Sequence, residues 1–200
     1  MELDFSTLQP AECYKVLANL ITPRPIAWIT TVNQEGAVNA APFSFFNCFG
    51  SSPPIVAFAP GNKGPGIPKD TARNIRDNRE FVVNIADETL ADKMVATSAS
   101  LPHGESELAI TGLTAAKSVS IMAPRIAEAP VSFECREWAT LEIGSNRMVV
   151  GTVHHAHIRD GILDPQSLHL RTEMFLPVGR MAAPDSYCRT SNQYEIKRPQ

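Results

Sequence analysis

A short stretch of charged and hydroxyl residues is the first candidate for chemistry in this sequence. Lys69, Asp70 and Thr71 follow the Gly- and Pro-rich run NKGPGIP and open a segment with helical spacing, KDTARNI. A helix that begins here leaves free amide N–H groups and the positive end of its dipole beside an ammonium and a hydroxyl group. Such a helix start suits a phosphate group. A plain capped helix with a solvated Lys69 uses the same residues, and the segment lacks the spacing of a Walker loop.

The second candidate is an uncharged aromatic stretch nearer the N-terminus. The run RPIAWITTVNQEGAVNAAPFSFFN covers Arg24 to Asn47. Its period-2 pattern predicts a hairpin of two strands, 26–32 and 37–41, with a break at Pro42 and a loop beyond it. Flat rings among small uncharged donors suit a flat ligand with polar edges. A corner of the core that buries the Phe side chains is the alternative.

The histidines form a third pattern. His155 and His157 point to one side of a predicted strand and His154 to the other. A metal ion on this pair would need a third ligand, and no carboxylate is suggestively placed in the sequence. Hydrogen-bonded histidines on a strand are the alternative, and we predict no metal site.

The other reactive residue types predict no catalytic side chain. No serine lies in a nucleophile-elbow motif. Cys48 has no basic neighbour to lower its pKa, so a packed thiol is favoured over a reactive one. Arg180, Tyr187 and Arg189 offer cations and a flat ring late in the chain; they could cover a ligand or belong to a solvated tail.

The remaining pattern indicates a protein built mainly from strands. Pro is frequent, with 16 residues in 200, which disfavours long helices. Strands are predicted at 55–59, 81–85, 131–143 and 147–158, helices at 11–20, from about 70, and at 88–99, and irregular structure over 100–130. Frequent turns between short strands are typical of a closed antiparallel barrel or a sandwich.

Composition excludes several classes of protein. The net charge of -3 argues against a nucleic-acid binder. No run approaches the ~20 apolar residues of a membrane helix, and no secretory signal precedes the four cysteines. We expect a cytoplasmic protein with reduced thiols and no membrane contact.

The order of these segments resembles the flavin reductase-like family, the FMN-binding split β-barrel proteins of the flavoredoxin type. The hairpin run is followed by SSPPIVAF, KDTARNI, EFVVNI, GLTAAKS, EAPVSFEC and VVGTVHHAHI. The resemblance covers about Leu20 to Pro199. It implies one domain over 1–200, a six-stranded antiparallel split barrel with flanking helices. Residues 1–19 would form an N-terminal arm, and 175–200 a tail that packs on the barrel or on a dimer partner.

The resemblance also implies a cofactor site. FMN would lie in a groove at or near the interface of a homodimer. Lys69, Asp70 and Thr71 would hold the phosphate end. Arg24 and Asn47 are further candidates for contact with the cofactor. The other implied contacts are Thr30 and Thr31 at the end of the first strand, and Asn39, Ala41, Ser44 and Phe45 along the isoalloxazine.

The activity implied is that of an NAD(P)H-dependent flavin reductase. NADH or NADPH, bound transiently, would pass hydride to the flavin, which would pass electrons to free flavin, oxygen or a partner such as an oxygenase. The alternative is an FMN-binding electron carrier without its own nicotinamide turnover.

Overall fold

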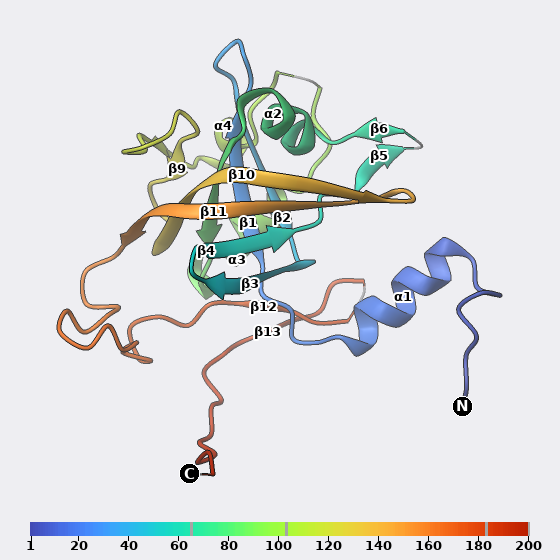
Figure 1. Cartoon of the computed structure of the whole chain (residues 1–200). Helices are drawn as coiled ribbons and strands as arrows, with labels where there is room; N and C mark the ends of the chain where they lie inside the picture. Colours follow the sequence, from blue (N-terminus) through green and yellow to red (C-terminus); the bar gives the residue numbers. More distant parts are fainter. Residues whose placement is uncertain (65, 103, 183, 200) are drawn as a thin grey trace.

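One large sheet organises the chain. The computed structural model describes residues 1–64, 66–102, 104–182 and 184–199, so one residue of the NKGPGIP loop, one of the segment 100–130 and two of the tail lie outside it. Seven strands follow one another in the order β2-β1-β7-β10-β11-β4-β3, and each neighbouring pair is antiparallel (Figure 1). Their bounds are β1 Ala27–Val32, β2 Val38–Phe43, β3 Phe46–Ser51, β4 Pro54–Phe58, β7 Glu80–Ile85, β10 Val131–Ile143 and β11 Asn146–Ile158. This sheet confirms the mainly β class and the split-barrel architecture.

The sheet curls because its two edges are joined by a very short connection. β2 and β3 stand at opposite ends of the strand order, yet β2 ends at Phe43 and β3 begins at Phe46. Two residues cannot span a flat sheet of this width. The edges therefore approach each other at Ser44 and Phe45, where Phe45 O accepts a hydrogen bond from Ala59 N at 2.9 Å.

The aromatic stretch differs from its predicted form in two ways. β2 continues through Pro42, which pairs with Trp28, because β2 is an edge strand and its outer side needs no N–H donor. The predicted loop beyond it is strand β3, which adds a seventh strand to the six expected. Cys48 lies on this edge and is exposed, so the expectation of a packed thiol is wrong.

Short helices and two-stranded ribbons fill the connections. The helices are α1 Pro10–Leu20, α2 Asp70–Asn78, the 3-10 turn η1 Glu88–Leu90, α3 Ala91–Ala96 and α4 Glu107–Thr111. The ribbons pair β5 Asn62–Gly64 with β6 Ile67–Pro68, β8 Ala115–Ala116 with β9 Arg125–Ile126, and β12 Gly179–Arg180 with β13 Tyr187–Cys188. The helix predicted over 88–99 is thus divided and ends early, and α4 was not expected. Within the described ranges, no helix is long and apolar enough to cross a membrane.

The core lies on both faces of β1. Trp28 packs with Met94 and Ile126 on one face, while Ile29 packs with Phe58 and Phe81 on the other. The rings of Phe43, Phe58 and Phe81 form a chain with centroid separations of 5.3 and 5.4 Å. One Phe of the aromatic stretch therefore belongs to the core, as the alternative reading of that stretch predicted.

Arg24 ties the arm and the tail to the start of β1. Its side chain is only 6% exposed. The guanidinium donates to the carbonyls of Ala18 and Ile21 at the end of α1, to Met181 O in the tail at 3.0 Å, and to Ser44 Oγ at 3.2 Å. The backbones of Arg24 and Arg180 also bond to each other in both directions, at 2.9 and 2.8 Å.

Candidate functional site

The site begins at the first turn of α2. Lys69 is the N-cap residue, with an extended backbone and no hydrogen bond from its side chain to the helix. The amide N–H groups of this turn are therefore not capped by the N-cap side chain. The ammonium of Lys69 lies 5.3 Å from the ring centre of Phe43. Burial, and then the charge of Lys63, lower the pKa of Lys69. A bound anion would oppose both effects, because a nearby negative charge stabilises the charged ammonium.

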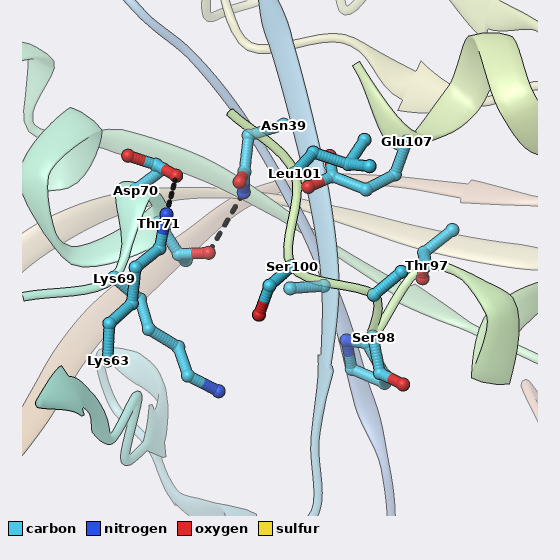
Figure 2. A pocket seen from close by; sticks show the side chains of 13 residues that line it. Asn39, Lys63, Lys69, Asp70, Thr71, Thr97, Ser98, Ser100, Leu101 and Glu107 are labelled. Carbon is cyan, nitrogen blue, oxygen red and sulfur yellow. Dashed lines mark hydrogen bonds and ion pairs between the residues drawn. The ribbon is translucent and has the colours of Figure 1, made fainter. Parts of the chain in front are cut away.

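Thr71 is held in place by a neighbour from the sheet. Its hydroxyl accepts a hydrogen bond from Asn39 Nδ2 on β2 at 2.9 Å, and the residue is 1% exposed. Since the oxygen accepts from Asn39, the hydroxyl proton is free to point at another acceptor. Asp70 beside it pairs with Lys63 at 2.6 Å (Figure 2). That ion pair offsets the carboxylate charge at the helix start.

The facing wall comes from a segment that sequence reasoning missed. Residues 97–101 follow α3 and line the same pocket as Lys69, which has a volume of about 70 Å³. Figure 2 shows the ammonium of Lys69 and the hydroxyl of Ser100 facing a common space. The run Thr97-Ser98-Ala99-Ser100 was the available signal, because small hydroxyl residues directly after a helix are suitable donors.

Glu107 closes the deep end of this pocket. It comes from α4, is 6% exposed, and accepts a hydrogen bond from Ala40 N at 2.9 Å. Burial raises the pKa of Glu107, because the charged carboxylate is poorly solvated there.

A wider groove of about 500 Å³ adjoins this pocket. The two share Pro42, Lys69 and Ser98. The groove is lined by four aromatic residues, by cations and by small polar residues: Tyr14, Phe43, Phe45, Tyr187, Arg147, Arg180, Ser44 and Asn146. Its volume is within the range of about 300–1,000 Å³ that is usual for small-molecule sites.

The tail contributes to the groove from the far end of the sequence. Arg180 lies over the ring of Tyr187, 4.7 Å from its centre, and donates to the carbonyls of Ser186 and Pro184. Arg189, by contrast, pairs with Glu88 at 2.5 Å and lines neither cavity.

Most of the residues predicted for the cofactor line one of these two connected cavities. Asn39, Ala41, Lys69, Asp70 and Thr71 line the small pocket, and Ser44 and Phe45 line the groove. Asn47 lines a separate apolar groove on β3.

The two predicted threonines of β1 lie beneath the residues that line the two cavities. Thr30 is fully buried and donates to Pro124 O at 2.5 Å. Thr31 accepts from Asn74 at 3.0 Å and is 3.5 Å from Asn39 Nδ2. Thr31 therefore supports Asn39 from behind, and neither threonine lines the two cavities.

The three histidines lie in the C-terminal half of β11, whereas Asn146 and Arg147, which line the groove, lie at its start. His155 and His157 share a face as predicted, with ring centres 5.0 Å apart. The structure also places a carboxylate beside them, which the sequence did not suggest: Glu134 lies 2.6 Å from His157. No group of three or more potential metal ligands occurs among the residues that the structure describes.

The donor set fits a flavin mononucleotide. A cationic helix start with hydroxyl donors matches a phosphate, and the aromatic groove that continues from it matches a flat ring system. The split barrel thus carries a groove whose lining would suit a flat ligand with an anionic end.

Comparison with known proteins identifies the family. The chain belongs to the flavin reductase-like family, since the model of the flavin reductase like domain matches residues 20–176. A protein of Deinococcus radiodurans is 38% identical over 98% of this chain and 88% of its own length.

Two solved structures are similar over nearly the whole chain. Nitrilotriacetate monooxygenase component B from Bacillus cereus is 30% identical, with a TM-score of 0.93 and 98% of each chain covered. The 2-nitrobenzoate 2-nitroreductase NbaA of Pseudomonas fluorescens is 33% identical, with a TM-score of 0.90, 100% of this chain and 96% of its own covered.

Proposed function

We propose that this chain binds FMN, with the phosphate at the start of α2 and the ring system in the adjoining groove. The observation that carries the proposal is that the two cavities adjoin, with Lys69, Pro42 and Ser98 lining both. Lys69 and the N–H groups of the first turn would hold the phosphate, and Thr71 would donate its free hydroxyl proton. Ser44 and Phe45 would contact the ring system.

The size of the small pocket favours FMN over FAD. A space of about 70 Å³ has room for a phosphate group, and far less than an additional nucleotide requires. Dissociated cofactor from the purified protein, separated by chromatography, distinguishes the two flavins. FAD as the main species would contradict the assignment.

The activity we propose is NAD(P)H-dependent flavin reduction. When bound, the flavin accepts a hydride from a nicotinamide and passes electrons to an acceptor. The chain's own part is to bind and orient the partners, and the open groove lined by Tyr187 and Arg180 would admit a second flat ring system. The similarity to a nitroreductase supports the reductase activity. The similarity to a component of a monooxygenase supports an oxygenase, or another redox protein, as the partner that receives the electrons.

Anaerobic stopped-flow spectroscopy tests this activity against the electron-carrier alternative. The flavin-loaded protein is mixed with NADH or with NADPH, and the absorbance of oxidised flavin is followed. Rapid bleaching by either nucleotide supports the reductase. If both leave the flavin oxidised while dithionite reduces it, the protein is an electron carrier.

We further propose a homodimer, with β3 and the β10–β11 hairpin in the interface. An apolar groove of about 390 Å³ lies here, and Phe49 and Ile143 are 63% and 71% exposed. β3 is an edge strand, and such an edge is a common site of association. This groove shares Phe45 and Arg147 with the proposed flavin groove, so the cofactor would lie next to the interface.

A further inference from the structure

A histidine pair on β11 lies in the part of the sheet that carries none of the proposed flavin contacts. β4 pairs with β11 only as far as Thr152, so the segment that follows, Val153–Ile158, leaves β11 open on that side. His155 and His157 share one face of this segment, with ring centres 5.0 Å apart and planes inclined by 48°.

The carboxylate of Glu134 fixes the orientation of His157. In the β10–β11 pairing, Glu134 lies opposite His155, and Ser132 lies opposite His157, so all four side chains are on one face. Glu134 Oε1 is 2.6 Å from His157 Nε2. If Nε2 carries the proton for this bond, the lone pair of Nδ1 is available to a ligand.

Glu134 is a buried carboxylate in direct contact with the partly exposed His157. It is fully buried, and its carboxylate accepts from Val119 N and Ser120 N at 2.7 Å and from Ser120 Oγ at 2.5 Å. A buried carboxylate that accepts several hydrogen bonds and orients an imidazole is the arrangement found behind histidine ligands of metal ions.

The spacing of the two rings also fits a shared ion. Imidazole nitrogens bind Zn²⁺ at about 2.0–2.1 Å in tetrahedral geometry, which places the centres of two such rings roughly 5 Å apart. The imidazole of His155 has no hydrogen bond or ion pair within the described ranges; its one side-chain interaction is the ring contact with His157. The fold thus provides a free imidazole beside an oriented one.

We propose that His155 and His157 chelate one divalent late transition-metal ion, such as Zn²⁺, Ni²⁺ or Cu²⁺, with Glu134 orienting His157 and water completing the coordination. Nitrogen ligands favour these ions over Mg²⁺ and Ca²⁺, which prefer oxygen. The site is independent of the flavin groove, so its occupancy and the flavin content are separate measurements.

The competing interpretation is structural. Glu134 and His157 would then only anchor the loop at 118–120 to the sheet, and His155 would have no role. The variant His155→Ala separates the two, because it removes a metal ligand without removing any bond that the fold uses. His154→Ala is the matched control: His154 is on the same strand, is exposed, and bonds to Thr152 Oγ1 at 2.9 Å.

Isothermal titration of the untagged full-length protein with Zn²⁺ and with Ni²⁺ near neutral pH tests the proposal. We expect one ion per chain in the wild type and in His154→Ala, loss of that binding in His155→Ala and His157→Ala, and no response to Mg²⁺. Glu134→Gln should weaken binding by about 10–100-fold while circular dichroism remains native.

Two results would overturn the site. One is retention of the bound ion in both His155→Ala and His157→Ala, which would locate the metal elsewhere. The other is the absence of saturable binding by the wild type up to about 1 mM free ion.

Discussion

Lys69 is the residue on which the proposed phosphate site depends most directly. Its ammonium is half-buried without an ion pair in the described part of the chain, and burial lowers its pKa. Pairing with a phosphate would supply the missing ion pair and would offset the cost of burying the ammonium.

We expect Lys69→Glu to weaken flavin binding by about 10–100-fold, because a charged hydrogen bond is replaced by repulsion. Fluorescence titration with FMN measures the dissociation constant, and thermal unfolding without flavin checks the fold. Lys117→Glu makes the same charge change at an exposed position and should bind FMN as the wild type does. Wild-type affinity in Lys69→Glu would remove the phosphate assignment.

Glu134 governs a pH dependence of stability. Its folded pKa of about 2 is below the ordinary value of 4.5, so its contribution is fully present above pH 4.5 and is lost as the pH falls towards 2. The shift corresponds to about 3 kcal/mol of unfolding free energy.

Glu134→Gln should therefore be less stable than the wild type at neutral pH, and the difference should shrink between pH 4.5 and 2. Urea unfolding across this range measures both curves, with Glu35→Gln, a change at an exposed turn residue, as the control. A constant difference down to pH 2 would show that Glu134 does not stabilise the fold through its charge.

At the scale of elements, β11 approaches the side chain of Phe81 on β7 very closely at Gly151. A side chain at Gly151 would place its Cβ 2.4 Å from Phe81 Cζ and 3.2 Å from Arg136 O. Phe81 is fully buried in the core, so the ring has little room to move.

Gly151→Ala should lower the free energy of unfolding by about 1–3 kcal/mol, because overpacking forces the ring or the strand to shift. Chemical denaturation measures this free energy of unfolding. Gly61→Ala is the comparison, since nothing lies within 4 Å of an added Cβ there and its φ is not positive. Adding Phe81→Leu to Gly151→Ala should restore part of the loss; equal stability of Gly151→Ala and wild type would refute the close approach.

At the scale of the whole molecule, the exposed apolar surface of β3 and the β10–β11 hairpin is the proposed dimer interface. Phe49→Asp together with Ile143→Asp should convert the dimer to a monomer, because burying two carboxylates in an apolar interface is costly. Sedimentation velocity measures the oligomeric state. Ile110→Asp introduces one such charge on α4, at a residue that is 60% exposed, and should leave the dimer intact. A wild-type protein that sediments as a monomer would itself contradict the proposal.

The sequence by itself determined the features that depend on local patterns. Alternation along 131–143 and 147–158 predicted β10 and β11 to within a residue, and the KDT start predicted α2, because both signals arise from neighbouring residues. The order of such segments was enough to indicate the family, and most of the residues that it implied for the cofactor line one of the two cavities.

Only the tertiary structure decided how distant segments meet. The curled sheet brings residues 97–101 and the tail to Lys69, turns the aromatic stretch into edge strand β3, and places Thr30 and Thr31 behind the wall. It also sets Glu134 beside His157, 23 residues away in sequence. Strand pairing and closure are contacts between remote residues, and the period-2 pattern of one strand carries no information on which other strand it meets.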